Sequence, residues 1–344
     1  MGASLSVMCG QLLVVGIPGH ELAADDTKPY GGVTLFKRNV ASIEQVVALT
    51  RSLRDAAPPD LPPLVAIDQE GGRVVRIGPP ALALPAMRKI GDLGDEAFAT
   101  RLARAQAEEL RALGITMSFG PVADVNTRPE NPVIGDRAFA TTPEAVARFA
   151  VAWADGLAEG GLLTCPKHFP GHGDTTVDSH LALPRVERAR GALQSIELAP
   201  FAALARRPSV SAMMTAHVVF SAYDDKPATM SSVLLGDVLR KELAFEGVVF
   251  SDDLEMKAIA MPIGEAAVAA ISAGCDALLV CARLDLAAEA HAALVHEAEK
   301  NGAFRSRVED AFDRFVAMRR RVPGASGTFA PHPELAEELA RRLG

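Results

Sequence analysis

Three of the chain's eight histidines lie in one stretch, KHFPGHGDTTVDSH, residues 167–180. Asp178 and His180 are two residues apart, so the carboxylate can orient the imidazole and hold its proton, which suits acid/base catalysis near neutral pH. Histidine and aspartate also bind metals, so a metal site is a second interpretation. The stretch is rich in Gly and Pro and lacks helical HxxxH or CxxC spacing, which favours acid/base work and polar recognition. Taken singly, Asp174 and Asp178 could instead cap backbone groups of the loop.

Other charged and imidazole side chains also follow short apolar runs. They are Asp68, Gln69, Glu70, Arg73 and Arg76 after Leu64–Ile67; Asp124, Asn126, Asn131, Asp136 and Arg137 after Thr116–Phe119; Lys167 and His168 after Leu162–Cys165; His217 after Ala212–Thr215; and Ser251, Asp252 and Asp253 after Gly247–Phe250. A purely structural scaffold does not need this many polar groups at the ends of its strands. We therefore predict that they form one functional site.

The elements that must position these groups alternate along the whole chain. Eight runs of about four to six residues are apolar throughout, as buried parallel strands are. They are Leu12–Ile17, Gly32–Phe36, Leu64–Ile67, Thr116–Phe119, Leu162–Cys165, Ala212–Thr215, Gly247–Phe250 and Ala277–Val280. Helical periodicity is found between them, in Ser42–Ala56, Asp95–Leu113, Thr142–Glu159 and Ile263–Ala273, with Ser42 and Thr142 as candidate N-caps.

Repeated β-then-α units predict a single-domain α/β fold, a (β/α)8 TIM-like barrel, in which catalytic groups lie at the carboxyl ends of the strands. An open doubly wound sheet is the alternative, but no GxGxxG motif follows the first strand. We assign residues 1–322 to the catalytic barrel. Residues 323–344 form a C-terminal tail, whose sequence PELAEELARRL predicts a surface helix.

Charge and composition limit the classes of partner. The chain has 35 Lys and Arg against 43 Asp and Glu, a net charge of −8, which argues against nucleic acid as a partner. The apolar run LLVVGI near the N-terminus is too short to span a membrane and no basic segment precedes it, so we expect neither membrane association nor a targeting signal. The cysteines show no CxxC spacing and are expected to be buried and reduced, as in a cytoplasmic protein. They are Cys9, Cys165, Cys275 and Cys281.

The motifs DQEGGRV, IGDRAF, KHFPGHGDTTVDSH and FSDDLEM, in this order, resemble those of bacterial β-N-acetylglucosaminidases (β-hexosaminidases) of glycoside hydrolase family 3. The resemblance runs from about residue 10 to about residue 320, and the block that begins KHFPGHGDT is its most specific part. It is closest to single-barrel members, which lack the second domain that many relatives append.

The resemblance implies roles for individual residues. Asp252 is the nucleophile, and His180 is the acid/base with Asp178 as its partner. The sugar hydroxyls and the acetamido group are held by the residues that match Asp68, Arg76, Arg137, Lys167 and His168. Three alternatives stay open: Arg76 could simply pair with Glu70 at the barrel rim, His172 and His217 could be structural, and Asp174 has no assigned role.

Only one of the two adjacent aspartates is expected to attack. Side chains alternate along a strand, so Asp252 and Asp253 cannot both point at the substrate. Asp253 is therefore expected to face the barrel wall or the adjoining loop, where it caps the turn that begins at Leu254.

These residue types suit a retaining glycosidase, which needs an attacking carboxylate and a proton donor for the leaving oxygen. The expected activity is that of an exo-acting β-N-acetylglucosaminidase that releases terminal GlcNAc from cell-wall muropeptide fragments in the cytoplasm, during peptidoglycan recycling. We expect a small carbohydrate substrate, no cofactor, no metal and a monomer. The alternatives are a phosphorylase with the same nucleophile and histidine, a sugar-binding protein that has lost catalysis, and a metal-dependent hydrolase.

Overall fold

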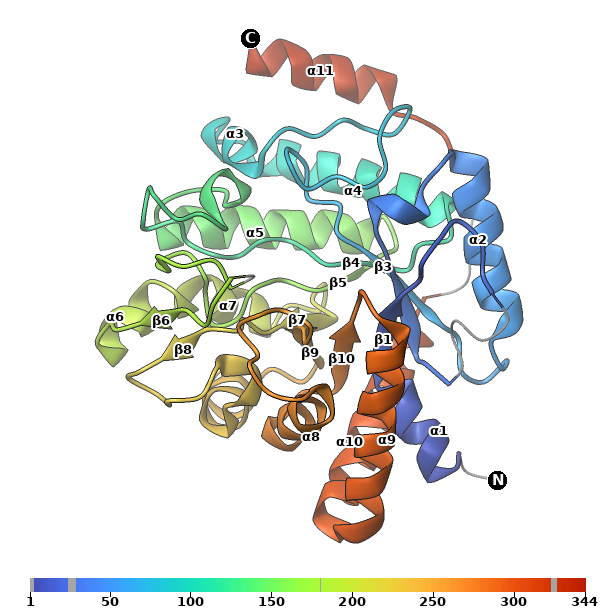
Figure 1. Ribbon diagram of the computed structural model, residues 1–344. Coiled ribbons are helices and arrows are strands. Elements are labelled where there is room, and N and C mark those ends of the chain that lie inside the picture. The colour runs from blue at the N-terminus through green and yellow to red at the C-terminus, as the bar shows by residue number, and fades with distance from the viewer. Residues whose placement is uncertain (1–2, 24–28, 180, 323–326) are drawn as a thin grey trace.

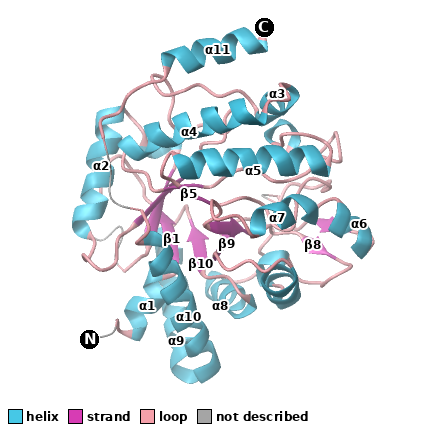
Figure 2. Cartoon of the chain, turned by 180° about the vertical axis from the view of Figure 1, so that it is seen from behind, coloured by secondary structure: helices cyan, strands magenta, loops and turns pink. Residues whose placement is uncertain are grey.

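The computed structural model describes residues 3–23, 29–179, 181–322 and 327–344. Within these ranges one parallel sheet has the strand order β5-β4-β3-β2-β1-β10-β9-β7 and is surrounded by helices (Figures 1 and 2). Its two ends meet just beyond β5, where the Met214 amide donates to the Pro166 carbonyl (3.0 Å) and the Phe169 amide donates to the Met214 carbonyl (2.8 Å). The sheet is thus a nearly closed barrel, which confirms the (β/α)8 prediction over the open sheet.

The barrel strands lie where the apolar runs predicted them, and two of the runs match in full. Their bounds are β1 (Leu13–Gly16), β2 (Gly32–Leu35), β3 (Leu64–Ile67), β4 (Met117–Ser118), β5 (Leu163–Thr164), β7 (Ala212–Met214), β9 (Val248–Asp253) and β10 (Ala277–Val280). β9 continues three residues past the predicted Phe250. As a result both Asp252 and Asp253 belong to the strand itself.

The helices form the outer layer. Their bounds are α1 (Leu5–Gln11), α2 (Ile43–Ala56), α3 (Met87–Asp92), α4 (Glu96–Ala112), α5 (Pro143–Glu159), α6 (Arg190–Ser195), α7 (Leu198–Ala205), α8 (Ile263–Ala273), α9 (Leu284–Lys300), α10 (Gly302–Arg319) and α11 (Pro333–Leu343), with short 3-10 segments η1 (Lys37–Asn39), η2 (Gly135–Arg137) and η3 (Ala228–Met230) and a π-helical segment η4 (Val233–Glu242). The Ser42 hydroxyl caps α2 as predicted, accepting from the Gln45 amide at 3.2 Å. Thr142 precedes α5 without a capping bond from its side chain, and Pro143 starts that helix instead.

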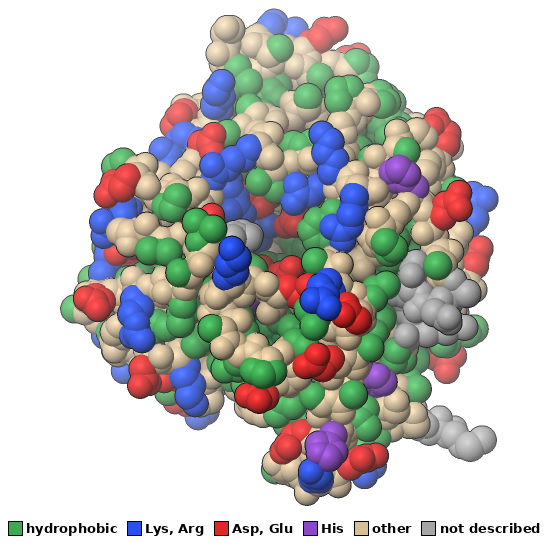
Figure 3. All heavy atoms as spheres, viewed as in Figure 1, with side chains coloured by type: hydrophobic (Ala, Val, Ile, Leu, Met, Phe, Trp, Pro, Cys, Tyr) green, Lys and Arg blue, Asp and Glu red, His purple; other side chains and the backbone are tan. Residues whose placement is uncertain are grey.

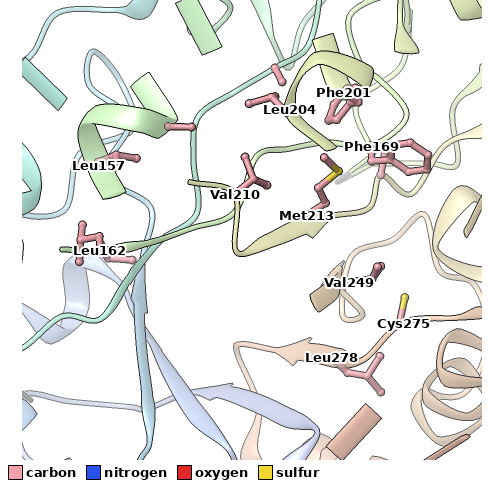
Figure 4. Packing of buried hydrophobic residues seen from close by; sticks show 14 of the residues in the cluster. Leu157, Leu162, Phe169, Phe201, Leu204, Val210, Met213, Val249, Cys275 and Leu278 are labelled. Carbon is pink, nitrogen blue, oxygen red and sulfur yellow. The ribbon is translucent and has the colours of Figure 1, made fainter. Parts of the chain in front are cut away.

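Successive strand residues pack into two different apolar environments. In β7, Met213 belongs to the layer between barrel and helices, whereas Ala212 and Met214 belong to the barrel interior. Figure 4 shows the helix-side layer around Met213, with Leu204 and Val210 beside it. Because both faces of each strand are buried in apolar surroundings, the strands read as continuous apolar runs rather than alternating ones.

Two features depart from a regular repeat. In residues 17–31, between β1 and β2, the described part of the chain contains no helix. A separate two-stranded parallel sheet pairs β6 (Arg185–Val186) with β8 (Val219–Phe220). Each of these strands has two residues, which is too short for an apolar pattern to predict.

None of the helices described here has the length and apolar character needed to cross a membrane.

The C-terminal helix α11 lies against α4 (Figure 1). Leu339 is buried, the Arg342 guanidinium lies 4.0 Å from the centroid of the Phe98 ring, and Arg101 pairs with Glu338 at 2.7 Å. The boundary between barrel and tail at residue 322 stays a prediction.

Candidate active site

The carboxyl ends of the barrel strands surround a pocket of about 300 Å³. Acidic and basic side chains lie together around the hollow near the centre of the face in Figure 3, in agreement with the charged lining of this pocket. The predicted residues Asp68, Arg76, Arg137, Lys167, His168 and Asp252 all line it, together with Glu70, His172, Ser179, Asp253 and an apolar group that includes Phe36, Val74, Phe119, Val133, Met214, Met256 and Leu279.

A connected set of ion pairs runs through the pocket lining. The Lys167 ammonium lies 2.6 Å from Asp68 Oδ1 and 2.6 Å from Glu70 Oε1. Arg137 donates two hydrogen bonds of 2.8 Å to the two oxygens of Glu70. Arg76 pairs with Asp68 at 3.6 Å. The alternative pairing of Arg76 with Glu70 is therefore wrong, because Arg137 and Lys167 already bind the Glu70 carboxylate.

Glu70 and Lys167 keep their charges at neutral pH despite their burial. Burial alone would raise the pKa of Glu70, but the charges of Arg137 and Lys167 outweigh it and hold that pKa far below its ordinary value. Burial would lower the pKa of Lys167, but the charges of Asp68 and Glu70 raise it. The pocket therefore presents fixed charges, which form stronger hydrogen bonds to neutral hydroxyl groups than uncharged side chains do.

His168 is held by Asp124, a fully buried aspartate after β4. Asp124 Oδ2 lies 2.7 Å from His168 Nδ1, while its Oδ1 accepts from the backbone amides of His168 (3.2 Å) and His172 (2.6 Å). Burial would raise the pKa of Asp124, but the charge of His168 lowers it, so the carboxylate is ionised. An ionised carboxylate accepts only, so His168 Nδ1 carries a proton and Nε2 is the ring nitrogen left for the pocket.

His172 is hydrogen-bonded through both ring nitrogens. Its Nδ1 lies 2.8 Å from Thr175 Oγ1, and its Nε2 lies 3.0 Å from Ser179 Oγ. Burial and the charge of His168 lower the pKa of His172 to about 4, so the ring is neutral near neutral pH. Both ring contacts join His172 to other residues of its own loop, 171–179.

Asp252 is an ionised, half-buried carboxylate. Its Oδ1 accepts the backbone N–H of Asp253 at 2.8 Å. Burial would raise the pKa of Asp252, but the charges of His217 and His168 outweigh it, and the net effect lowers that pKa. The side chain is therefore in the form that an attacking carboxylate requires.

Asp253 caps the turn that follows β9, as expected. Its Oδ1 accepts from the backbone amides of Glu255 (3.2 Å) and Cys281 (3.3 Å). Burial, followed by the negative charges of Glu255 and Asp252, raises the pKa of Asp253 to about 7. Asp253 also lines the pocket beside Asp252. The alternation of side chains along β9 therefore separates the two carboxyl groups, but both remain part of the pocket lining.

The predicted acid/base, His180, lies outside the described residues. Asp178 is half-buried, and its carbonyl accepts from the amides of Leu181 (2.8 Å) and Ala182 (3.1 Å). Of the described residues in this part of the loop, Ser179 lines the pocket and Asp178 does not.

Ion pairs hold the base of this loop, and Asp174 takes part in them. Arg188 donates to Asp174 and to Glu197, each at 2.8 Å. Arg128 donates to the Asp174 carbonyl at 3.1 Å. Gly171 has a φ of +133°, and a Cβ there would lie 2.9 Å from Glu197 Cβ, so only glycine fits against that side chain. The base of the loop is thus rigid.

In the part of the chain that the structure describes, no three His, Cys, Asp or Glu side chains converge in a way that could hold a metal ion. All four cysteines are buried and unbridged. The expectation of no metal and no cofactor stays a prediction.

Sequence reasoning placed Glu70 and Asp124 at strand ends but gave neither a role in the site. Their position after β3 and β4 was the available signal. Their partners Arg137 and His168 could not be identified from the sequence, because the pairs join residues 67 and 44 positions apart.

A (β/α)8 barrel with an ionised carboxylate in a pocket of paired charges is the architecture of an enzyme that acts on a small polar molecule. The model of the glycosyl hydrolase family 3 N-terminal domain matches residues 5–318. The chain therefore belongs to glycosyl hydrolase family 3 and is a glycoside hydrolase of the β-hexosaminidase type.

Individual relatives agree with this placement. The β-hexosaminidase of Neisseria meningitidis serogroup B is 44% identical over 268 residues, which cover 75% of this chain and 73% of the relative. The structure of a family 3 β-N-acetylglucosaminidase from Paenibacillus sp. has a TM-score of 0.93 at 39% identity and covers 99% of this chain and 68% of its own. NagZ from Neisseria gonorrhoeae, in complex with N-trifluoroacetyl-D-glucosamine, has a TM-score of 0.80 at 34% identity, with 97% and 96% covered.

Proposed function

We propose that this chain is a retaining exo-β-N-acetylglucosaminidase that releases terminal GlcNAc from cell-wall muropeptide fragments, as part of peptidoglycan recycling in the cytoplasm. The observation that carries the proposal is the ionised, half-buried Asp252 in a pocket lined by Asp68, Lys167 and Arg137. The β-hexosaminidase and β-N-acetylglucosaminidase names of the relatives support the choice of sugar. A pocket of about 300 Å³ suits one sugar unit, which favours exo action.

The proposed reaction has two steps with His180 as the proton carrier. In the first, Asp252 attacks the anomeric carbon, the bond from that carbon to the leaving oxygen breaks, and His180 donates its proton to the leaving oxygen. In the second, water attacks the glycosyl-aspartate, His180 takes the proton, and the Asp252 carboxylate is released. Asp178 is the partner that favours the protonated imidazole. Two displacements at one carbon retain its configuration.

Binding of the sugar is assigned to Asp68, Arg76, Arg137, Lys167 and His168. Support comes from their shared position in the lining and from the ion pairs that join Asp68, Lys167, Glu70 and Arg137 there. Nε2 of His168 is the ring nitrogen that hydrogen-bonds a sugar hydroxyl, since Asp124 binds Nδ1. The protein is proposed to act as a monomer, without metal or cofactor.

The test compares hydrolysis of nitrophenyl β-GlcNAc with that of the β-glucoside and β-xyloside, in phosphate and in an inert buffer. We expect a preference for the GlcNAc substrate, initial release of β-GlcNAc by NMR, equal rates in both buffers, and activity that survives EDTA. Release of α-GlcNAc would contradict the retaining mechanism. Formation of a sugar 1-phosphate would identify a phosphorylase, and binding without turnover would identify a sugar-binding protein.

A further inference from the structure

We propose that His217 is a positioning residue for the nucleophile, holding the Asp252 carboxylate through the backbone of Asp253. The inference rests on the proposed role of Asp252 and adds a residue whose function the sequence left open. His217 follows β7, whereas Asp252 and Asp253 end β9, so the contact joins the carboxyl ends of two neighbouring strands. The His217 side chain is fully buried.

The hydrogen bonds form a short chain that ends at the nucleophile. His217 Nε2 lies 3.0 Å from the Asp253 carbonyl oxygen, and a carbonyl only accepts, so Nε2 carries a proton and donates it. The N–H of the same residue, Asp253, donates to Asp252 Oδ1 at 2.8 Å. His217 therefore holds the carbonyl group of Asp253, and the amide group of Asp253 holds the attacking carboxylate of Asp252.

The other ring nitrogen of His217 is hydrogen-bonded as well. Its Nδ1 lies 2.7 Å from the hydroxyl of Thr229, which is fully buried in η3. That hydroxyl is also 2.8 Å from Thr215 Oγ1 and 3.3 Å from the Ala216 carbonyl oxygen. With both ring nitrogens engaged, rotation of the ring would break two buried hydrogen bonds, so the donor to Asp253 has a fixed direction.

Position and charge act in the same direction at Asp252. A carboxylate that must attack a carbon in line loses rate steeply when it is misplaced, on the order of a hundredfold for about 1 Å. The positive charge of His217 also lowers the pKa of Asp252. Among the described residues, the other titratable groups that interact with Asp252 are Cys165, Lys167, His168, His172, Asp253 and Cys281.

Two variants of His217 test whether the hydrogen bond to the Asp253 carbonyl, rather than the imidazole ring itself, is required. In His217→Gln the side-chain amide reaches the position of Nε2 and can still donate to the Asp253 carbonyl, whereas in His217→Asn the shorter amide cannot. We expect His217→Asn to lower kcat about 10- to 100-fold with KM changed less than about threefold, and His217→Gln to recover most of that loss. Both variants remove the imidazole charge, so the acidic limb of kcat/KM should move to higher pH in each.

The loss should be the same for activated aryl and for poor leaving groups, because both need the nucleophile. Trapping with a 2-fluoro glycosyl substrate, followed by mass spectrometry, measures the rate of the first step and the labelled residue. A wild-type enzyme without label on Asp252 would refute the proposed function itself. Label on Asp252 at unchanged rate in His217→Asn, or equal losses in the Asn and Gln variants, would overturn the role of His217.

A second pair covers the case in which both His217 variants fail to fold by circular dichroism. Thr229→Val keeps the shape but removes the hydroxyl that orients the ring, and Thr229→Ser keeps the hydroxyl. We expect Thr229→Val to lower kcat about 3- to 10-fold and Thr229→Ser to retain at least about half of it. Unchanged turnover in Thr229→Val would overturn the inference.

Discussion

The Lys167 ammonium lies 2.6 Å from Glu70 Oε1, in a contact where the two side chains are only 3% and 4% exposed. Such a pair stabilises the site only as long as both partners are present, because either charge alone is costly to bury. The same ammonium binds Asp68, so one side chain pairs with two carboxylates that come from the loop after β3.

Lys167→Met is therefore expected to lower the free energy of unfolding by about 3 to 5 kcal/mol. The variant leaves Asp68 and Glu70 with one cation fewer, and urea unfolding measures the loss. Lys241→Met is the matched control, because the pair of Lys241 with Asp237 is exposed to solvent. Its effect should stay below about 1 kcal/mol, and an equal effect of the two variants would show that burial of the Lys167 pair does not matter.

Asp252→Asn is expected to lower kcat at least about a thousandfold while substrate binding persists, because an amide cannot form the glycosyl ester. Asp253→Asn should keep kcat within about tenfold, since this side chain caps a turn. Steady-state kinetics of both variants provide the comparison. A glycosyl label on Asp253 or Glu255 after trapping would refute the assignment, and the absence of any label would point to the substrate's own acetamido group.

His180→Ala should slow turnover most for substrates with poor leaving groups and least for dinitrophenyl glycosides, since a stabilised phenolate leaves without a proton. Asp178→Asn should weaken the same step and move the basic limb of the rate profile to lower pH, because an uncharged partner favours imidazolium less. A series of aryl glycosides measures the dependence. Thr176→Ala, an exposed change in the same loop, should behave as wild type. Equal losses on good and poor leaving groups would contradict the assigned role.

Glu109 on α4 is buried, and burial raises its pKa to about 7. A carboxyl with a pKa raised above its unfolded value stabilises the fold below the unfolded pKa, and that contribution is lost as the pH rises through about 7. Glu109→Gln keeps an acceptor for the Leu82 amide, which lies 2.8 Å from Glu109 Oε2, without the charge. The variant should therefore be more stable than wild type at about pH 8, by up to about 3 kcal/mol, with little difference at about pH 5.

Thermal unfolding at the two pH values tests this expectation. Glu108→Gln, at a partly exposed position next to Glu109 on the same helix, should leave the pH dependence of Tm unchanged. If Glu109→Gln lowered Tm at about pH 8, the carboxylate would be stabilising and the argument from burial would be wrong.

The sequence alone was sufficient for the barrel and for the position of the site. The runs Leu64–Ile67 and Ala277–Val280 and the helix Ile263–Ala273 have the observed bounds, because burial on both faces and helical periodicity are local properties. Given the barrel, every strand end points to one face, so the pocket lining could be anticipated at Asp68, Lys167 and Asp252.

The tertiary structure alone decided which charged groups pair. Arg76 binds Asp68 rather than Glu70, Asp124 holds His168, and His217 reaches the backbone of Asp253. The two strands β6 and β8 were likewise outside the reach of periodicity. The physical reason is that apolar burial depends on residue type and spacing along the chain. Hydrogen bonds and ion pairs instead depend on distances of a few tenths of an ångström between loops that the barrel brings together, such as Asp68 and Lys167, 99 positions apart.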